Sequence, residues 1–393
     1  MTSINRRGFL KGSLLTASGA LLGAATGGTH AVAREQEEVP KKPITRRLGR
    51  TGIDLPVVSM GVMRADNPGL VRAALKSGMV HLDTAHGYQR GNNEGMLGKI
   101  LKEYPRDSFV LATKVGKDDR ETFVGKFNLS LERLQMPFVD ILYVHAVSSR
   151  DEMLDEELLS TLASLKDSGK VRFIGVSTHR NEPEVLNAAA DSGAYDVVLT
   201  SVNFKQNHYV DVRAAIAKAA GAGVGIVAMK TMAGGYFDKD RTKPINCKAA
   251  LKWVLQDSNI TTSIPGITSY DQLSENASVN FDITLTPAEK TDLVQGALQG
   301  GLYCNGCESC VPDCPKKLPI PDLMRAYMYA YGYGNAAMAR DLVAELRIGG
   351  SPCEGCAQCA ATCVKGFPLR EKIADIRRVA EVPEEFISTG LFT

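Results

Sequence analysis

The sequence has no surplus of charge of either sign and, after its first few dozen residues, no long hydrophobic run. Lysine and arginine number 46 and aspartate and glutamate number 44, so electrostatics gives no reason to expect a nucleic-acid partner. No apolar stretch in that part of the chain reaches the length of a membrane-spanning helix. The 393 residues are enough for one large core and a small second domain.

The sequence also lacks the dinucleotide-binding fingerprint and has almost no cysteine before residue 304. No segment carries GxGxxG between a strand and a helix, which disfavours an open, doubly wound sheet. Only Cys247 precedes residue 304, and we expect it to be a small buried side chain. The other eight cysteines lie between Cys304 and Cys363, a distribution typical of a metal site.

The N-terminus predicts an export signal. Residues 5–11 read NRRGFLK, a weakly apolar stretch covers residues 12–28, and residues 31–33 read AVA. Paired arginines, a mild apolar region and such a cleavage site indicate a twin-arginine signal over residues 1–33. We therefore expect export to the periplasm by the twin-arginine machinery, with membrane anchoring if the signal is kept. The alternative to a signal is that these residues form a frayed helix that stays on the mature protein. Residues 34–44 form a charged, proline-containing linker.

Strand-like and helix-like patterns alternate from residue 45 to about residue 298. The turn at residues 49–52 predicts a hairpin over residues 47–58, and clear helical patterns cover residues 121–134, 156–168, 210–222 and 249–255. Eight short apolar runs predict strands at residues 57–61, 79–83, 110–114, 139–145, 173–177, 197–201, 225–229 and 262–265. Eight such units are the number that closes a (β/α)8 TIM barrel, which we predict for residues 45–298.

Polar side chains stand where three consecutive predicted strands end. Asp83 closes the second strand, Lys114 the third and His145 the fourth, and Tyr88 lies on the loop after the second. Each has an ordinary explanation by itself; Asp83, for example, could cap the next helix. Because the carboxyl ends of barrel strands face one pocket, we expect the four side chains to converge on a catalytic site.

Those four residue types suit proton transfer to a carbonyl. A phenol with a pKa near 10 is a poor proton donor to a carbonyl unless its phenolate is stabilised. A nearby ammonium provides that stabilisation. We expect Lys114 to lower the pKa of Tyr88, Asp83 to hold Lys114, and His145 to position the substrate oxygen as a neutral donor. No side chain supplies a hydride, so a nicotinamide cofactor is implied.

The motif DTAHGY at residues 83–88, with Asn93, Glu94, Lys114 and His145, resembles the aldo-keto reductases over about residues 45–280. The resemblance implies a (β/α)8 barrel, a catalytic tetrad at the four positions above and Tyr88 as general acid. It also implies that Ser177 in the motif GVS contacts the nicotinamide amide. The segment from residue 264 to residue 276 would hold the adenosine end, with contacts from Gly266, Gln272, Glu275 and Asn276.

The sequence departs from the family at the cofactor. Residues 266–273 contain no basic side chain for a 2′-phosphate, so the choice between NAD(H) and NADP(H) stays open. Ser201 and Met229 stand where many members have an amide and an aromatic residue at the nicotinamide. Lys230, directly after Met229, is expected to contact a phosphate.

The cysteines form two copies of C-x2-C-x2-C-x3-C, the spacing of bacterial two-cluster ferredoxins, in which the fourth cysteine binds the other cluster. This predicts two [4Fe-4S] clusters, one held by Cys304, Cys307, Cys310 and Cys363, the other by Cys353, Cys356, Cys359 and Cys314. Zinc and a disulfide framework are the alternatives.

The cysteine region departs from a compact ferredoxin. Pro315 follows the ferredoxin pattern, but Val364 replaces the second proline. The long spacer predicts a largely helical ferredoxin-like domain over residues 299–393. Its four alternating tyrosines, at residues 327–333, are expected to pack between helices rather than form a stacking platform.

The sequence thus predicts an exported aldo-keto-reductase-like oxidoreductase with two iron–sulfur clusters. Its partners would be a small carbonyl or alcohol, such as a sugar, and a redox protein. Hydride transfer moves two electrons, whereas each cluster takes one, and no flavin-binding motif is visible. Direct electron flow from the nicotinamide to a cluster would therefore require a partner protein or a bound flavin. We also expect nicotinamide to be carried out of the cytoplasm bound to the protein. The alternatives are an electron-transfer protein whose barrel is a non-catalytic scaffold, and clusters that serve only as a structural staple.

Overall fold

In the computed structural model, residues 42–348, 350–383 and 387 are described. The predicted signal at residues 1–33 and most of the predicted linker lie outside that range. No helix among the described residues is both long enough and apolar enough to cross a membrane.

The first described elements form the predicted hairpin. Strands β1 (Thr45–Arg47) and β2 (Asp54–Pro56) pair antiparallel around a short 3-10 turn at Gly49–Thr51. Gly49 has a φ of +48°, and a Cβ there would lie 2.4 Å from the Gly223 carbonyl oxygen. The turn therefore requires glycine because it lies directly against the loop before a barrel strand.

Eight parallel strands follow one another around the sheet in chain order. They are β3 (Met60–Gly61), β4 (His81–Asp83), β5 (Val110–Gly116), β6 (Val139–His145), β7 (Val171–Thr178), β8 (Val197–Ser201), β9 (Gly225–Met229) and β10 (Thr262–Ser263). Parallel bridges from Val58 to Ser263 and from Gly61 to Gly266 join the last strand to the first. The sheet is thereby closed, and the predicted (β/α)8 barrel is confirmed.

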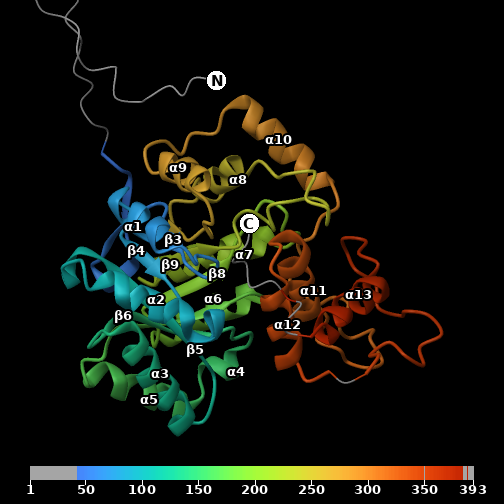
Figure 1. Cartoon of the computed structure of the whole chain (residues 1–393), viewed down its shortest axis with the longest axis horizontal. Coiled ribbons are helices and arrows are strands. Elements are labelled where there is room, and N and C mark those ends of the chain that lie inside the picture. The colour runs from blue at the N-terminus through green and yellow to red at the C-terminus, as the bar shows by residue number, and fades with distance from the viewer. Residues whose placement is uncertain (1–41, 349, 384–386, 388–393) are drawn as a thin grey trace, which may run out of the picture. The chain divides into compact units, whose positions relative to one another are not determined.

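Helices surround the strands, as Figure 1 shows. They are α1 (Pro68–Lys76), α2 (Asn92–Leu101), α3 (Arg120–Leu134), α4 (Arg150–Met153), α5 (Glu156–Asp167), α6 (Glu182–Ser192), α7 (Tyr209–Gly221), α8 (Cys247–Val254), α9 (Tyr270–Val279) and α10 (Pro287–Leu298). Side-chain caps mark many of their starts; Asp119 caps α3, Asp155 caps α5 and Ser269 caps α9.

The strand register brings the predicted site residues to one end of the barrel. Asp83 pairs with Ala112, two residues before Lys114, and His145 pairs with Gly116, two residues after it. Ser201 at the end of β8 pairs with Met229 at the end of the neighbouring strand β9. All these residues therefore lie at the carboxyl mouth, where barrel enzymes carry out their chemistry.

The C-terminal segment is largely helical, as expected. It contains α11 (Ile320–Tyr327), a π-helical turn (Met328–Gly332), α12 (Ala336–Glu345) and α13 (Leu369–Glu381), which gather beside the barrel in Figure 1. Their apolar residues share one core with Ile245, Ala249 and Leu293, which precede residue 299. The packing thus continues across the domain boundary that we place at residue 298.

Candidate active site and cysteine sites

The four side chains of the predicted tetrad meet at the barrel mouth. Lys114, only 1% exposed, forms a salt bridge with Asp83 and donates hydrogen bonds to the Thr84 carbonyl oxygen at 2.7 Å and the Tyr88 hydroxyl at 3.3 Å. The His145 ring lies edge-on to the Tyr88 ring, with centroids 6.0 Å apart. A phenol, an ammonium and an imidazole therefore lie together at the barrel mouth, although they come from three separate parts of the sequence.

Burial sets the protonation states of these groups. It lowers the pKa of Lys114, against the opposing effect of the Asp83 carboxylate. It also lowers the pKa of His145 to about 3, assisted by the charge of Lys114, so the ring is neutral. Neutral imidazole at this position agrees with the donor role expected for it.

The pKa of Tyr88 differs from the expectation. Burial raises it well above 10, and the negative charge of Asp83 raises it further. Tyr329 and Tyr333 of the C-terminal segment add to that effect. Desolvation is the largest of these effects, and together they outweigh the positive charge of Arg325, which lowers the pKa of Tyr88. Tyr88 is therefore a firmly protonated phenol in this structure.

The residues expected at the nicotinamide differ in whether their side chains already have hydrogen-bond partners. Ser177 Oγ already accepts a hydrogen bond from the Ala146 amide at 3.0 Å. Ser201, 1% exposed, has a hydroxyl without a hydrogen-bond partner. Met229 is buried beside it. Lys230 is already engaged by the C-terminal segment, because its ammonium donates a hydrogen bond to the Tyr329 hydroxyl at 3.0 Å.

The residues expected at the adenosine end lie in the loop before α9 and along that helix. Gln272 Oε1 accepts hydrogen bonds from the Thr268 amide and hydroxyl, while Gly266 and Glu275 are exposed. Asn276 is 2% exposed and its Oδ1 has no partner, as a cofactor contact would leave it. These placements suit the predicted role, which remains a prediction.

A basic residue near this segment escaped the sequence analysis. Arg64, from the loop after β3, lies against Gly266 and donates to the Tyr333 carbonyl oxygen at 2.6 Å. Its guanidinium also lies over the Tyr333 ring, 4.9 Å from the centroid. The absence of basic residues in 266–273 thus does not make this side of the mouth free of positive charge.

The C-terminal segment contributes Tyr329 to the mouth. Lys230 Nζ lies 4.5 Å from the centroid of its ring, and Tyr333 stacks on it at 5.5 Å. Burial would raise the pKa of Tyr329, but the charges of Lys230 and Arg325 outweigh it and leave the pKa below 10. The alternation of tyrosines in residues 327–333 was the only sequence signal for this residue, and it predicted packing alone.

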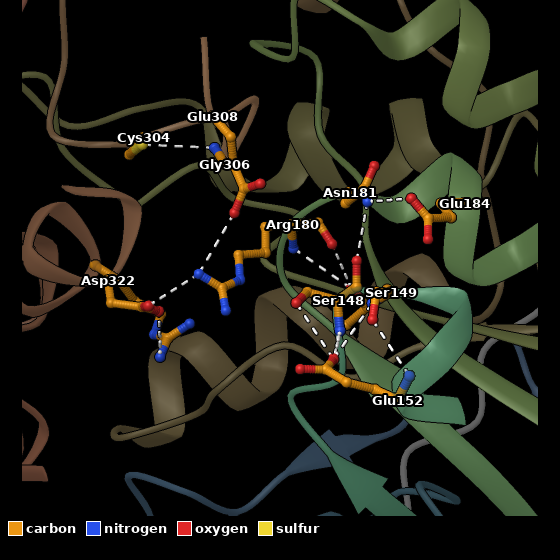
Figure 2. A network of polar contacts seen from close by, with 12 residues as sticks. Ser148, Ser149, Glu152, Arg180, Asn181, Glu184, Cys304, Gly306, Glu308 and Asp322 are labelled. Carbon is orange, nitrogen blue, oxygen red and sulfur yellow. Dashed lines mark hydrogen bonds and ion pairs between the residues drawn. The ribbon is translucent and has the colours of Figure 1, made fainter. Parts of the chain in front are cut away.

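His179 and Arg180 follow β7 and face the same C-terminal segment. The His179 ring lies 6.2 Å from that of His145. Figure 2 shows Arg180 between two carboxylates of that segment, Asp322 at 3.1 Å and Glu308 at 3.4 Å. A single histidine and a single arginine after a strand gave no sequence signal for these contacts.

The first cysteine set surrounds one pocket. Cys304, Cys307, Cys310 and Cys363 all line it. Burial, with a smaller contribution from the neighbouring cysteine sulfurs, raises the pKa of Cys304 to about 12 and that of Cys310 to about 11. Backbone amides of Gly306 and Lys365 point at the Cys304 and Cys363 sulfurs, each at 3.4 Å. Four thiols around one pocket, with amide donors, fit a cube whose four irons each take one thiolate.

The second set is also gathered. Burial raises the pKa of Cys353, and Cys359, Cys356 and Cys314 raise it further, so the four sulfurs are electrostatic neighbours. None of the nine cysteines is in a disulfide; the ninth, Cys247, is partly buried at the start of α8. Within the described residues, no three His, Cys, Asp or Glu side chains converge on a single metal ion.

Comparison with known proteins identifies the class of both parts. The sequence model of the Aldo/keto reductase family matches residues 60–249, and that of the 4Fe-4S dicluster domain matches residues 303–368. The chain therefore carries an aldo/keto reductase domain and a 4Fe-4S dicluster domain. Together these matches support an oxidoreductase that contains iron–sulfur clusters.

Particular relatives cover mainly the barrel. The chain is 27% identical to L-galactose dehydrogenase from Arabidopsis thaliana over 283 residues, covering 59% of this chain and 86% of that protein. It is 29% identical to glyoxal reductase from Bacillus subtilis over 261 residues, covering 61% and 89%. An aldo-keto reductase from Bacillus halodurans superposes with a TM-score of 0.54 at 22% identity, covering 65% and 96%. This last likeness shows the barrel fold.

Proposed function

We propose that the protein interconverts a carbonyl and an alcohol with NAD(H) or NADP(H), with Tyr88 as the proton donor or acceptor. The observation that carries this proposal is the contact of the Lys114 ammonium with both the Asp83 carboxylate and the Tyr88 hydroxyl. His145 stands edge-on to the same phenol.

The residues of the chain divide the work. In reduction, the Tyr88 hydroxyl donates its proton to the substrate oxygen while His145, neutral at any pH well above 3, donates a hydrogen bond to the same oxygen. The phenolate that remains is stabilised by the Lys114 ammonium, which Asp83 keeps charged. A nicotinamide bound at the mouth would supply the hydride in this direction and accept it in the other.

The cofactor and cluster assignments belong to the same proposal. Ser201, with its unpartnered hydroxyl, and the buried Asn276 would contact the dinucleotide. The two cysteine sets would hold two [4Fe-4S] clusters, which carry single electrons. The relatives named for sugar and glyoxal substrates support a small carbonyl or alcohol, such as a sugar, as the substrate.

The cellular setting is proposed from the sequence alone. The residues at 5–11 and 31–33 support export by the twin-arginine machinery to the periplasm. Cluster insertion would then precede export, and a redox protein at the destination would exchange electrons with the clusters. Fusing the protein without its first 33 residues to a reporter should abolish export, and a reporter that is still exported would contradict this assignment.

Replacing Tyr88 by phenylalanine tests the catalytic part. The Tyr88→Phe variant should lose at least about a hundredfold in nicotinamide-dependent reduction of small aldehydes, because it removes the proton donor. Its iron content should be unchanged. Tyr104→Phe, which removes a hydroxyl at a distance from the mouth, is the matched control. Equal turnover in the two variants would refute the role of Tyr88.

An electron-transfer protein with a non-catalytic barrel is a second candidate. One observation favours it: Tyr329 already holds Lys230, which the sequence predicts to contact the cofactor. On this reading, a low-potential donor would bleach the iron–sulfur absorption reversibly, and calorimetry would detect no nicotinamide binding. Nicotinamide binding in the micromolar range would exclude it.

A further inference from the structure

The two cysteine repeats have the same spacing but different surroundings. Their cysteines are similarly exposed, since each set has one exposed, one buried and two partly buried members. The residues between the cysteines differ. Asn305 and Gly306 of the first repeat are buried, whereas Glu354 and Gly355, at the equivalent positions of the second repeat, are exposed. The two sites are therefore distinguished by what surrounds the cysteines rather than by the cysteines themselves.

The first repeat lies against the barrel. A Cβ on Gly306 would be 2.6 Å from the His179 carbonyl oxygen, just after β7. Glu308 forms an ion pair with Arg180 at 3.4 Å (Figure 2), and Cys304 lines a pocket together with the same arginine. The first cysteine set therefore adjoins the barrel mouth.

The second repeat is open to solvent. A Cβ on Gly355 would meet no atom within 4 Å. Helix α13 holds this stretch through two backbone contacts, since Arg370 donates to the Ala357 carbonyl oxygen and Arg377 to that of Gly350, each at 3.1 Å. The second site is therefore accessible to another protein. Its exposed residues are Glu354, Gly355, Ala357, Gln358, Cys359, Ala360 and Thr362.

The two sites are also neighbours. Cys314, assigned to the second set, follows Cys310 of the first set by one turn of chain, and its sulfur contributes to raising the pKa of Cys310. Such an electrostatic effect falls with distance, so the two sulfurs lie close together. A charge that arrives at the second site is therefore next to the first.

Hydrogen-bond donors are concentrated on the first set. The amides of Gly306 and Lys365 point at two of its sulfurs, each at 3.4 Å, and the Ser309 hydroxyl donates to a third, that of Cys307, at 3.5 Å. In the part of the chain that the structure describes, no donor points at a sulfur of the second set. Hydrogen bonds to the sulfurs stabilise the added negative charge of a reduced cluster and so raise its reduction potential.

Asn305 is a further donor, and it lacks a partner. Its side chain is 2% exposed and lines the pocket that the first cysteine set surrounds. Neither its Nδ2 nor its Oδ1 has a hydrogen-bond partner. Because buried polar groups are nearly always paired, we expect the amide to have a partner in the occupied site, and the sulfur of a cluster accepts an N–H. Glu354, its counterpart in the second repeat, is exposed and carries a carboxylate instead.

We propose that the exposed second repeat is the docking surface for a small one-electron carrier protein, and that the buried Asn305 amide helps the barrel-side site to accept the electron that enters there. One electron passes from the reduced carrier to the second site and then to the first, so that each donor is oxidised as the next centre is reduced. No proton moves and no bond forms or breaks. Burial opposes added negative charge at the first site, and Asn305 offsets part of that cost.

This inference rests on the cluster assignment in the proposed function and specifies the surface through which its redox protein acts. Stopped-flow mixing tests that surface. The full chain, purified anaerobically with its clusters, is mixed with fully reduced flavodoxin, a small protein that gives up single electrons. Gln358→Trp, which places a large ring beside the exposed Cys359, should slow reduction by flavodoxin at least about tenfold.

Two controls belong to this measurement. Gln295→Trp makes the same change at an exposed position of α10 and should leave the flavodoxin rate unchanged. Dithionite is small enough to pass the added ring, so it should reduce Gln358→Trp as fast as it reduces the unmodified chain. If flavodoxin reduces Gln358→Trp and Gln295→Trp equally fast, the carrier does not dock on the second repeat.

A redox titration followed by electron paramagnetic resonance tests Asn305. The unmodified chain should show two midpoint potentials, one for each cluster. In Asn305→Ala one midpoint should fall by the equivalent of about tenfold in the equilibrium constant, about 59 mV for a one-electron couple, because a hydrogen bond to a charged group is lost. Asn305→Ser, which keeps a donor, should fall less. Midpoints equal to those of Asn259→Ala, an exposed asparagine before β10, would overturn the role of Asn305.

Glu354→Gln gives the complementary measurement at the second repeat. Removing this exposed carboxylate should raise the other midpoint by the equivalent of about two- to threefold, as expected for a charge that solvent screens. If Glu354→Gln and Asn305→Ala moved the same midpoint, the two residues would not act on separate sites and the proposal would be wrong.

Tyr88→Phe separates this inference from the catalytic part of the proposed function. It should leave both midpoints and the flavodoxin rate unchanged while carbonyl reduction is lost. Carbonyl reduction that does not depend on Tyr88 would therefore count against the proposed function alone, and equal flavodoxin rates in the two tryptophan variants against this inference alone. Iron far below about eight atoms per chain would refute the cluster assignment and this inference with it.

Discussion

Two glycines at equivalent positions of the cysteine repeat allow a sharp test of how the cluster-bearing segment meets the barrel. Gly306 precedes Cys307, and Gly355 precedes Cys356. Both have positive φ, +66° and +80°. Only Gly306 touches the barrel: a Cβ there would lie 2.6 Å from the carbonyl oxygen of His179, whereas one on Gly355 would meet nothing within 4 Å.

The two alanine variants should therefore differ. Each incurs the left-handed conformation of a residue with a side chain, a cost of about 1 kcal/mol. Gly306→Ala adds a contact closer than real Cβ atoms show, against backbone that cannot rotate away, and overpacking of this kind costs about 1–3 kcal/mol. We expect Gly306→Ala to lower the free energy of unfolding by about 3 kcal/mol and Gly355→Ala by about 1 kcal/mol.

Urea unfolding of the cluster-loaded chain under argon gives both values, with circular dichroism for the helices and visible absorption for the clusters. Equal losses of stability in the two variants would show that the first cysteine repeat does not pack on the end of β7.

Three further predictions concern single groups. Lys114→Met should abolish most carbonyl reduction and lower the free energy of unfolding by about 3–5 kcal/mol in urea, because it leaves the buried Asp83 carboxylate unpaired; a loss below 1 kcal/mol, within the range of an ordinary surface change, would contradict this. His145 has a pKa of about 3 in the folded chain and 6.5 as an unperturbed group, so the unfolded chain binds the extra proton between those values and stability should fall as the pH drops through that window; urea midpoints at pH 7 and pH 4.5 should differ less in His145→Gln, and an equal difference would contradict the shifted pKa. Cys314→Ala and Cys363→Ala should each lower the iron content from about eight to about four atoms per chain, by removing opposite clusters, while Cys247→Ala leaves it unchanged; retention of all iron in either variant would refute the crossed ligand sets.

Much of the barrel could be predicted from the sequence, because the local hydrophobic pattern and the overall fold agree there. The runs at 139–145, 197–201 and 225–229 are buried strands with the predicted bounds. A closed parallel sheet is covered on both faces, so such strands are continuously apolar and their polar ends stand out. The strands at 57–61 and 262–265 are shorter than predicted, since only two residues of each join the ladder beside the bridges that close the barrel.

Contacts between the barrel and the C-terminal segment could not be predicted from the sequence. Lys230 and Tyr329 are separated by 99 positions, and Arg64 and Tyr333 by 269, so no local spacing connects them. The expected pKa of Tyr88 was wrong because the prediction considered the charge of Lys114 but neither the burial of the phenol nor the effect of Tyr329 and Tyr333 of the C-terminal segment. Polar contacts at such distances follow from packing, which a single sequence does not reveal.

The core shared by Ile245, Ala249 and Leu293 with α11 and α13 makes the two regions one cooperative folding unit rather than a barrel with a detachable appendage. Truncation after residue 298 would expose that apolar surface to water and yield an insoluble barrel. Evolution could exchange the iron–sulfur segment only together with the helices beneath it. Loss of iron from the cysteine-bearing segment would therefore also disturb the packing of the barrel mouth, since Arg180 and Lys230 at the mouth contact that segment.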